Sequence, residues 1–217
     1  MTEAFLSGGD IHRETAAAVF GVAPAEVTDE MRKKAKAVNF GIVYGISAYS
    51  LSGDLGISGA EAKRYIESYY EKYPTVKEYL DALPAKAEEL GYSETLYRRR
   101  RFIPELSATN HMTREFGKRV ARNSPIQGTA ADLIKLAMIR VDRRLREEEP
   151  RAHLVMQVHD ELVVECPREA GERVAALIRR EMESIATVPA SLYQTGEAFS
   201  LAVPLTVDVV TTENWME

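Results

Sequence analysis

The chain has 217 residues, of which 45% are hydrophobic and 28% charged, a composition typical of a globular protein and not of a disordered or fibrous one. Its single cysteine, Cys166, excludes an intramolecular disulfide and a multi-cysteine zinc site. The sequence has no secretory signal and no apolar run of about 18 residues, so we expect a cytoplasmic protein that does not contact a membrane. The net charge of −5 argues against a protein that coats nucleic acid over its whole surface, but Thr95 to Arg122 contains eight basic and two acidic residues.

The first half of the sequence predicts a series of helices joined by short turns. Thr28 precedes two acidic residues, and together they are typical of a capped helix N-terminus. Pro74 suits the first turn of a helix, and Gly91 suits the position just after the end of one. With the apolar periodicity, these signals place helical segments at 16–20, 28–47, 60–73 and 75–90.

The middle of the sequence predicts a basic extended segment and then two helices. The extended segment covers 93–106, and the helix that resumes near Met112 is expected to be interrupted at Ser124-Pro125. A capping pattern at Thr129 then begins another helix. One face of this helix is apolar and comprises Ile134, Ala137, Met138, Val141 and Leu145.

The last part of the sequence predicts strands as well as a helix. Segments 154–158 and 162–166 are short, apolar and rich in β-branched residues, which favours a hairpin. An amphipathic helix is expected over 174–185, and a final strand over 201–210. The predicted fold class is therefore α+β.

A four-residue spacing relates Arg32, Lys36, Phe40 and Tyr44 within the 28–47 helix, so they form one stripe along its surface. The two cations suit phosphate oxygens, and the two aromatic rings suit a sugar or a base. Such a stripe indicates a nucleoside triphosphate site. The spacing equally allows a solvated basic turn followed by two buried aromatic residues. A different face is apolar and predicted to pack inward: Ala35, Val38 and Ile42.

The turn of the predicted hairpin carries His159, Asp160 and Glu161. A turn between two strands can project carboxylates from a rigid support, and oxygen ligands are those that magnesium prefers. Two-metal phosphoryl transfer also needs carboxylates from separate chain segments. The alternative interpretation is an acidic hairpin tip that is only solvated.

Two further polar groups indicate contacts with nucleic acid. Arg119, Asn123 and Gln127 recur at four-residue steps, and their side chains suit minor-groove acceptors or a phosphate backbone. The run Arg98 to Arg101 suits phosphates. A polar helix face and a solvated basic loop are the corresponding alternatives.

Residues 32–45 read R-K-K-A-K-A-V-N-F-G-I-V-Y-G and fit the pattern R-x-x-x-K-x-x-N-F-G-x-x-Y-G. Around them lie, in order, D-I-H at 10–12, T-L at 95–96 with R-R-R at 99–101, N-S-P-I-Q-G-T-A-A-D at 123–132, and Q-V-H-D-E at 157–161. These motifs and their order resemble the bacterial DNA polymerase I family, the family A DNA polymerases, over nearly the whole chain. Arg98 stands where that family usually has a glycine.

The resemblance implies an enzyme that carries out template-directed DNA synthesis, in which a primer 3′-hydroxyl attacks the α-phosphate of a deoxynucleoside triphosphate with the help of two Mg²⁺ ions. It implies that His12, Arg32 and Lys36 hold the triphosphate and that Lys36 also protonates the leaving pyrophosphate. Phe40 would pack on the deoxyribose. Tyr44 would close the pocket against the new base pair.

The resemblance also implies a metal site and a DNA-binding surface. Asp160 would be a catalytic metal ligand, and Glu161 a second catalytic carboxylate beside it. The residues implied to contact primer–template DNA are Arg99, Arg100, Arg119, Asn123, Gln127 and His159.

The resemblance finally implies how the chain is organised. Residues 1–92 are expected to form the helical fingers and 93–217 the later palm, with the metal-site hairpin at 153–166. In the family, the thumb, the first part of the palm and its metal-binding aspartate come before these motifs. We therefore expect the chain to be inactive alone and an upstream segment to supply that aspartate. Two rival hypotheses are a non-catalytic module that binds nucleic acid or nucleotide, and a helical domain that binds a protein partner.

Overall fold

The computed structural model describes residues 1–188 and 199–214. The chain divides into two compact units, Met1–Gly128 and Thr129–Glu217, and the boundary falls within one long helix. The predicted division into fingers (1–92) and later palm (93–217) stays a prediction.

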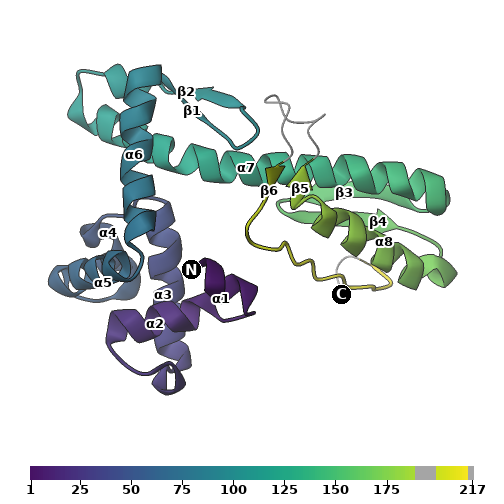
Figure 1. The fold of residues 1–217 in the computed structure, drawn as a ribbon, viewed down its shortest axis with the longest axis horizontal. Coiled ribbons are helices and arrows are strands. Elements are labelled where there is room, and N and C mark those ends of the chain that lie inside the picture. Colours follow the sequence, from purple (N-terminus) through teal and green to yellow (C-terminus); the bar gives the residue numbers. More distant parts are fainter. Residues whose placement is uncertain (189–198, 215–217) are drawn as a thin grey trace. The chain divides into compact units, whose positions relative to one another are not determined.

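The first unit is mainly helical (Figure 1). Its elements in chain order are α1 (Thr2–Leu6), α2 (Ile11–Phe20), the 3₁₀ turn η1 (Pro24–Glu26), α3 (Asp29–Val43), α4 (Ala48–Leu55), α5 (Gly59–Lys72), α6 (Pro74–Leu90), β1 (Tyr92–Glu94), β2 (Arg100–Phe102), η2 (Pro104–Ser107) and the first part of α7 (His111–Glu148).

The second unit holds the rest of α7 and a small α+β arrangement. Its further elements are β3 (His153–Val158), β4 (Glu161–Glu165), η3 (Arg168–Ala170), α8 (Gly171–Ser184), β5 (Thr187–Val188) and β6 (Phe199–Ser200). The strands of the described residues pair as three antiparallel two-stranded sheets, β1 with β2, β3 with β4 and β5 with β6. The predicted α+β class is confirmed.

Helix α3 begins and packs as its sequence predicts. The Thr28 side chain accepts a hydrogen bond from the backbone N–H of Met31, at 3.2 Å, and so caps the helix. Val38 and Ile42 are buried in a core that includes Tyr65 and Tyr69 of α5. The helix ends at Val43 and not near Ser47, and the separate helix α4 follows at once. The buried face fixes which side of α3 remains open to solvent.

The predicted interruption at Ser124-Pro125 is wrong, because α7 continues through Pro125. Proline has no N–H and therefore leaves the carbonyl four residues earlier, that of Ala121, without its helical partner. The Ser93 hydroxyl of β1 donates to this carbonyl at 3.2 Å in a buried position. Thr129 consequently lies within α7, and the predicted helix start there is also wrong.

The core of the second unit lies between α7 and α8. Val141 and Leu145, from the predicted apolar face, are buried in one cluster with Val174 and Leu177 of α8. The predicted hairpin is confirmed as β3 and β4, whose register places Val158 opposite Glu161. His159 and Asp160 therefore form a two-residue turn.

The predicted strand over 201–210 is wrong, although side chains in this segment alternate between partly buried and exposed. No strand pairs with it among the described residues. Its backbone instead bonds to side chains of α8: the N–H of Val207 donates to Glu183 Oε1 at 3.1 Å, and Arg179 Nε donates to the Val207 carbonyl at 3.3 Å. Pro204 also lacks the N–H that a ladder requires.

Arg98 has a backbone φ of +63°, in the left-handed region that favours glycine. We expect Arg98→Gly to be more stable than Arg98→Ala by about 1 kcal/mol, since only glycine relieves this conformation. Both variants lose the 2.7 Å ion pair between Arg98 and Glu94, so the comparison isolates the backbone. Urea denaturation followed by circular dichroism measures the difference. Equal stabilities of the two variants would contradict the assignment of strain.

In the parts of the chain that the structure describes, no helix combines the length and the apolar character needed to cross a membrane.

Candidate functional site

Four of the predicted nucleotide-binding residues lie together where α2 packs against α3. The Lys36 ammonium lies 5.8 Å from the centre of the Phe40 ring, and the rings of His12 and Phe40 are 5.9 Å apart at 45°. Phe40 remains 48% exposed, so it is not a core residue. The structure thus brings the cations Arg32 and Lys36, the His12 imidazole and the accessible Phe40 ring to one surface. This grouping favours a binding site over the alternative of two buried aromatic residues.

Asp10 connects the start of α2 to Arg32. One carboxylate oxygen accepts the backbone N–H groups of His12 and Arg13 and caps α2. The other accepts Arg32 Nε at 2.5 Å. The Arg32 guanidinium lowers the pKa of Asp10 below its usual range. Since Nε faces Asp10, the terminal nitrogens of Arg32 remain available to an anion. Asp10 belongs to the D-I-H motif, but it was not predicted to act in the site.

The His12 imidazole contacts Asn39, which in turn is hydrogen-bonded to Thr15. Asn39 Nδ2 lies 2.8 Å from His12 Nδ1, and the hydroxyl of Thr15, which is fully buried, donates to Asn39 Oδ1 at 3.1 Å. Burial lowers the pKa of His12, and the cations Arg32 and Lys36 lower it further against the opposing effect of Asp10. Asn39 is part of the N-F-G motif, but neither it nor Thr15 was predicted to act in the site.

Tyr44, the fifth predicted nucleotide contact, lies at the C-terminal end of α3. With Phe40 and Arg119 it lines an open cavity of about 650 Å³, to which α4 contributes Ser50 and Asp54. Tyr44 is 46% exposed. A cavity of this size with an aromatic wall is large enough for a base or a nucleoside.

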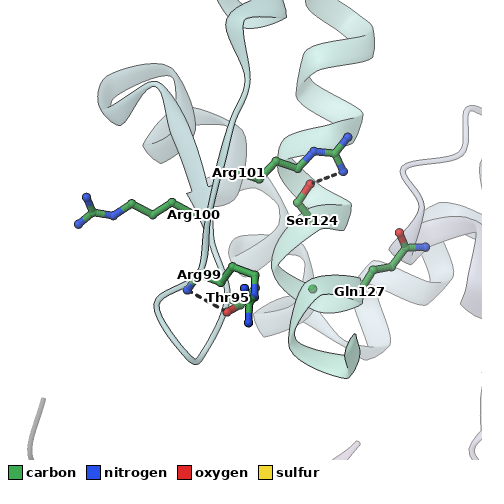
Figure 2. A pocket seen from close by; sticks show the side chains of 7 residues that line it. Thr95, Arg99, Arg100, Arg101, Ser124 and Gln127 are labelled. Atoms are coloured by element: carbon green, nitrogen blue, oxygen red, sulfur yellow. Dashed lines mark hydrogen bonds between the residues drawn. The ribbon is translucent and has the colours of Figure 1, made fainter. Parts of the chain in front are cut away.

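The arginine run after β1 lines a smaller cavity of about 160 Å³ with Thr95, Ser124, Gln127 and Gly128. Figure 2 shows Arg101 reaching to Ser124 of α7, with a distance of 3.2 Å between Arg101 Nη1 and the hydroxyl oxygen. The Thr95 hydroxyl accepts the backbone N–H of Arg99. These contacts anchor the segment 95–101 (the arginine loop). Its guanidinium groups therefore line a cavity that is suited to an anion.

Arg100 differs from its neighbours. In Figure 2 its side chain extends away from α7, where it lies 3.4 Å from Glu94 and 4.6 Å from the centre of the Tyr92 ring. Its charge is therefore partly compensated within the loop.

The three predicted DNA contacts on α7 have separate surroundings. Arg119 lies at the larger cavity and Gln127 at the smaller one. Asn123 lies between them, and its Oδ1 is buried without a hydrogen-bond partner in residues 1–188 and 199–214. A buried amide oxygen without a donor costs free energy, so the surroundings of Asn123 are not fully satisfied in the free chain.

The predicted metal-site residues lie at the β3–β4 turn in the second unit, where Asp160 and Glu161 are exposed. His159 has a φ of +53°, at the first position of a two-residue turn that usually holds glycine. Residues other than glycine that adopt such a conformation are concentrated at functional sites.

The donor set at this turn fits part of a magnesium site. Asp160 and Glu161 supply the hard oxygens that Mg²⁺ prefers. However, the described residues contain no group of three or more His, Cys, Asp or Glu side chains placed to hold a metal. A complete magnesium site would need a further carboxylate in addition to Asp160 and Glu161.

These motifs and sites have counterparts in known proteins. DNA polymerase I of Caldicellulosiruptor bescii is 47% identical over 217 residues, which cover 100% of this chain and 24% of that protein. DNA polymerase I of Deinococcus radiodurans is 45% identical over 100% of this chain and 21% of its own length. The chain therefore spans about a quarter of the length of these curated relatives.

A solved structure has the same fold. It is the POL domain of Pol1 from M. smegmatis in complex with DNA primer-template and dNTP, with a TM-score of 0.83 and 39% identity, and the match covers 94% of this chain and 34% of that one. The model of the family described as DNA polymerase family A matches residues 1–217. This chain belongs to DNA polymerase family A.

Proposed function

We propose that this chain supplies the nucleotide-binding helix and the later palm of a DNA-directed DNA polymerase. The reaction joins the primer 3′-oxygen to the α-phosphorus of a deoxynucleoside triphosphate, while the bond from that phosphorus to pyrophosphate breaks. The proton of the primer hydroxyl passes to water, and the leaving pyrophosphate accepts a proton from Lys36. Such a transfer requires positioning and charge neutralisation more than covalent help from the protein.

The observation that carries this proposal is the grouping of His12, Lys36 and Phe40 beside Arg32 on one accessible surface. Three groups that can donate to phosphate oxygens lie next to a ring that can pack against a sugar. The M. smegmatis relative, whose structure is named as a complex with primer-template and dNTP, supports the same assignment.

Each residue of this group has a distinct proposed role. Arg32, Lys36 and His12 bind the triphosphate, and Lys36 donates a proton to the leaving pyrophosphate. Phe40 packs on the deoxyribose, and Tyr44 closes the larger cavity against the new base pair. The open wall formed by Phe40 and Tyr44 supports this division between phosphate and base.

The proposed DNA contacts lie on the arginine loop and α7 of the first unit and, separately, on the β3–β4 turn of the second unit. Arg99 and Arg100 contact phosphates, whereas the Asn123 amide donates to an acceptor in the minor groove. The whole proposed set is Arg99, Arg100, Arg119, Asn123, Gln127 and His159.

We assign Asp160 as a magnesium ligand and Glu161 as a nearby carboxylate. In the complete enzyme, two Mg²⁺ ions would neutralise charge on the phosphates and favour the ionised primer hydroxyl. The incomplete donor set among the described residues supports the need for a further aspartate from an upstream polymerase segment. It equally favours the second candidate, a module that binds nucleotide or nucleic acid without turnover.

A chimaera separates the two candidates. This chain would replace the matching quarter of the C. bescii polymerase, to which it is 47% identical. We expect the chimaera to extend a primer by one nucleotide, Asp160→Asn to abolish extension, and Glu165→Gln, at the far end of the same hairpin, to retain it. A folded chimaera that binds primer–template in a salt-dependent way but never extends it would support the non-catalytic module.

The isolated chain gives the complementary result. We expect it to bind primer–template with an affinity that falls as salt rises, and to extend no primer. Extension by the isolated chain that Asp160→Asn abolishes would contradict the proposed need for an upstream aspartate.

A further inference from the structure

We infer that Asn39 is a positioning residue that holds the proton of the neutral His12 imidazole on Nε2, the nitrogen that faces away from Asn39. His12 then presents an N–H donor to a phosphate oxygen. The part of this inference that concerns phosphate rests on the proposed function, whereas the position of the proton follows from the contacts of the free chain.

The orientation of the Asn39 amide carries the inference. The Thr15 hydroxyl lies 3.1 Å from Asn39 Oδ1 and donates to it, so the amide oxygen is used on the side away from His12. Asn39 Nδ2, which can only donate, is left 2.8 Å from His12 Nδ1. A short contact to a donor requires His12 Nδ1 to be an acceptor, so the ring proton must be on Nε2.

Thr15 is suited to fix this amide because it cannot readily move. Its side chain is fully buried on α2, and its hydroxyl donates to Asn39 Oδ1, whereas in a reversed amide it would have to accept from Nδ2. The pair thus links α2 to α3, the two helices that carry the nucleotide-binding residues.

The charges around His12 favour the neutral ring that this arrangement needs. Burial lowers its pKa, and the neighbouring Arg32 and Lys36 lower it further, while Asp10 has the opposite effect. A protonated ring would place an N–H on Nδ1 against the N–H of Asn39. The hydrogen-bond geometry and the neighbouring charges therefore both favour the neutral form of the His12 ring.

This state matters because the two neutral forms of histidine meet a phosphate differently. With the proton on Nε2, the ring donates to a phosphate oxygen. With the proton on Nδ1, a lone pair on Nε2 faces that oxygen and repels it. We expect loss of the correct form to weaken nucleotide binding by about tenfold, the usual effect of losing a hydrogen bond to a charged group.

Nitrogen-15 NMR of the histidine rings tests the position of the proton in the full chain without nucleotide. We expect the His12 signal, identified by its loss in His12→Gln, to show a protonated Nε2 and an unprotonated Nδ1. Asn39→Asp replaces the donor with an acceptor and should move the proton to Nδ1. A protonated Nδ1 in the unaltered chain would overturn the inference, whether or not any variant folds.

Variants of Thr15 provide a matched pair. Thr15→Val removes the hydroxyl at constant shape and should give a mixture of the two ring forms, whereas Thr15→Ser retains the hydroxyl and should leave the spectrum unchanged. Identical spectra for the two variants would remove Thr15 from the inference.

Titration with dATP separates this inference from the proposed function. Asn39→Asp should weaken binding by about tenfold in the unaltered chain but much less in a His12→Ala background. An equal loss in both backgrounds would indicate only the added negative charge and would overturn the positioning role. If the unaltered chain bound no dATP, the proposed function would fail, while the NMR result would stand.

Discussion

Replacing Lys36 with alanine is expected to weaken dNTP binding by about 10- to 150-fold, which corresponds to the roughly 1.5–3 kcal/mol typical of a hydrogen bond to a charged group. Lys36 is exposed and lies over the edge of the site, 5.8 Å from the centre of the Phe40 ring. Its ammonium is therefore free to move onto a phosphate without breaking a buried contact. Isothermal titration of the chain with dATP measures the change.

Lys34→Ala is the matched control, because it removes the same charge from the same helix. Lys34 lies about 200° around α3 from Lys36, at about 100° per residue, and its ammonium is 2.9 Å from a Glu30 oxygen. We expect this variant to bind dATP within about twofold of the unaltered chain, since an exposed pair contributes little. Equal losses for the two lysines would mean that only overall charge attracts the nucleotide.

Signals that act within a few residues were sufficient to predict α3, α5 and α6 of the first unit, but α1 and α4 were not predicted. The cap at Thr28, the proline at the start of α6 and the glycine after it all act locally, and the structure confirms each one. The hairpin of β3 and β4 was predicted for the same reason, because two short apolar strands flank a two-residue turn.

Two wrong predictions concern segments whose backbone bonds to distant partners. Pro125 remains helical because Ser93, 28 residues away from Ala121, supplies the donor that the proline leaves missing. The segment 201–210 has the alternation of a strand, yet α8 side chains satisfy its Val207 backbone. Neither of these hydrogen-bonded contacts can be predicted from the local sequence pattern.

The candidate site shows the same difference between local signals and contacts of distant segments. The four-residue stripe of α3 follows from one helix, so its residues could be predicted together. The contacts that orient them join separate helices: Asp10 to Arg32, and Thr15 through Asn39 to His12. Sequence spacing therefore predicted the groups that we propose to bind a ligand, but not those that hold them in place.

Gly128→Ala is expected to destabilise the chain by about 1–3 kcal/mol, although alanine is the better helix former. A Cβ at this position would lie 2.6 Å from Thr95 Cγ2, which is too close for two carbon atoms. Thr95 cannot withdraw freely, because its hydroxyl accepts the backbone N–H groups of Tyr97 and Arg99, each at 3.2 Å. Urea denaturation followed by circular dichroism measures the loss.

Thr95→Ser decides whether this one methyl group is responsible, since it removes Cγ2 and retains the hydroxyl. In that background, Gly128→Ala should become neutral or stabilise the chain by up to about 1 kcal/mol, the helix propensity that the clash conceals. A change of sign would show that the close approach of α7 to the arginine loop requires Gly128. An equal loss in both backgrounds would instead attribute the effect to backbone displacement.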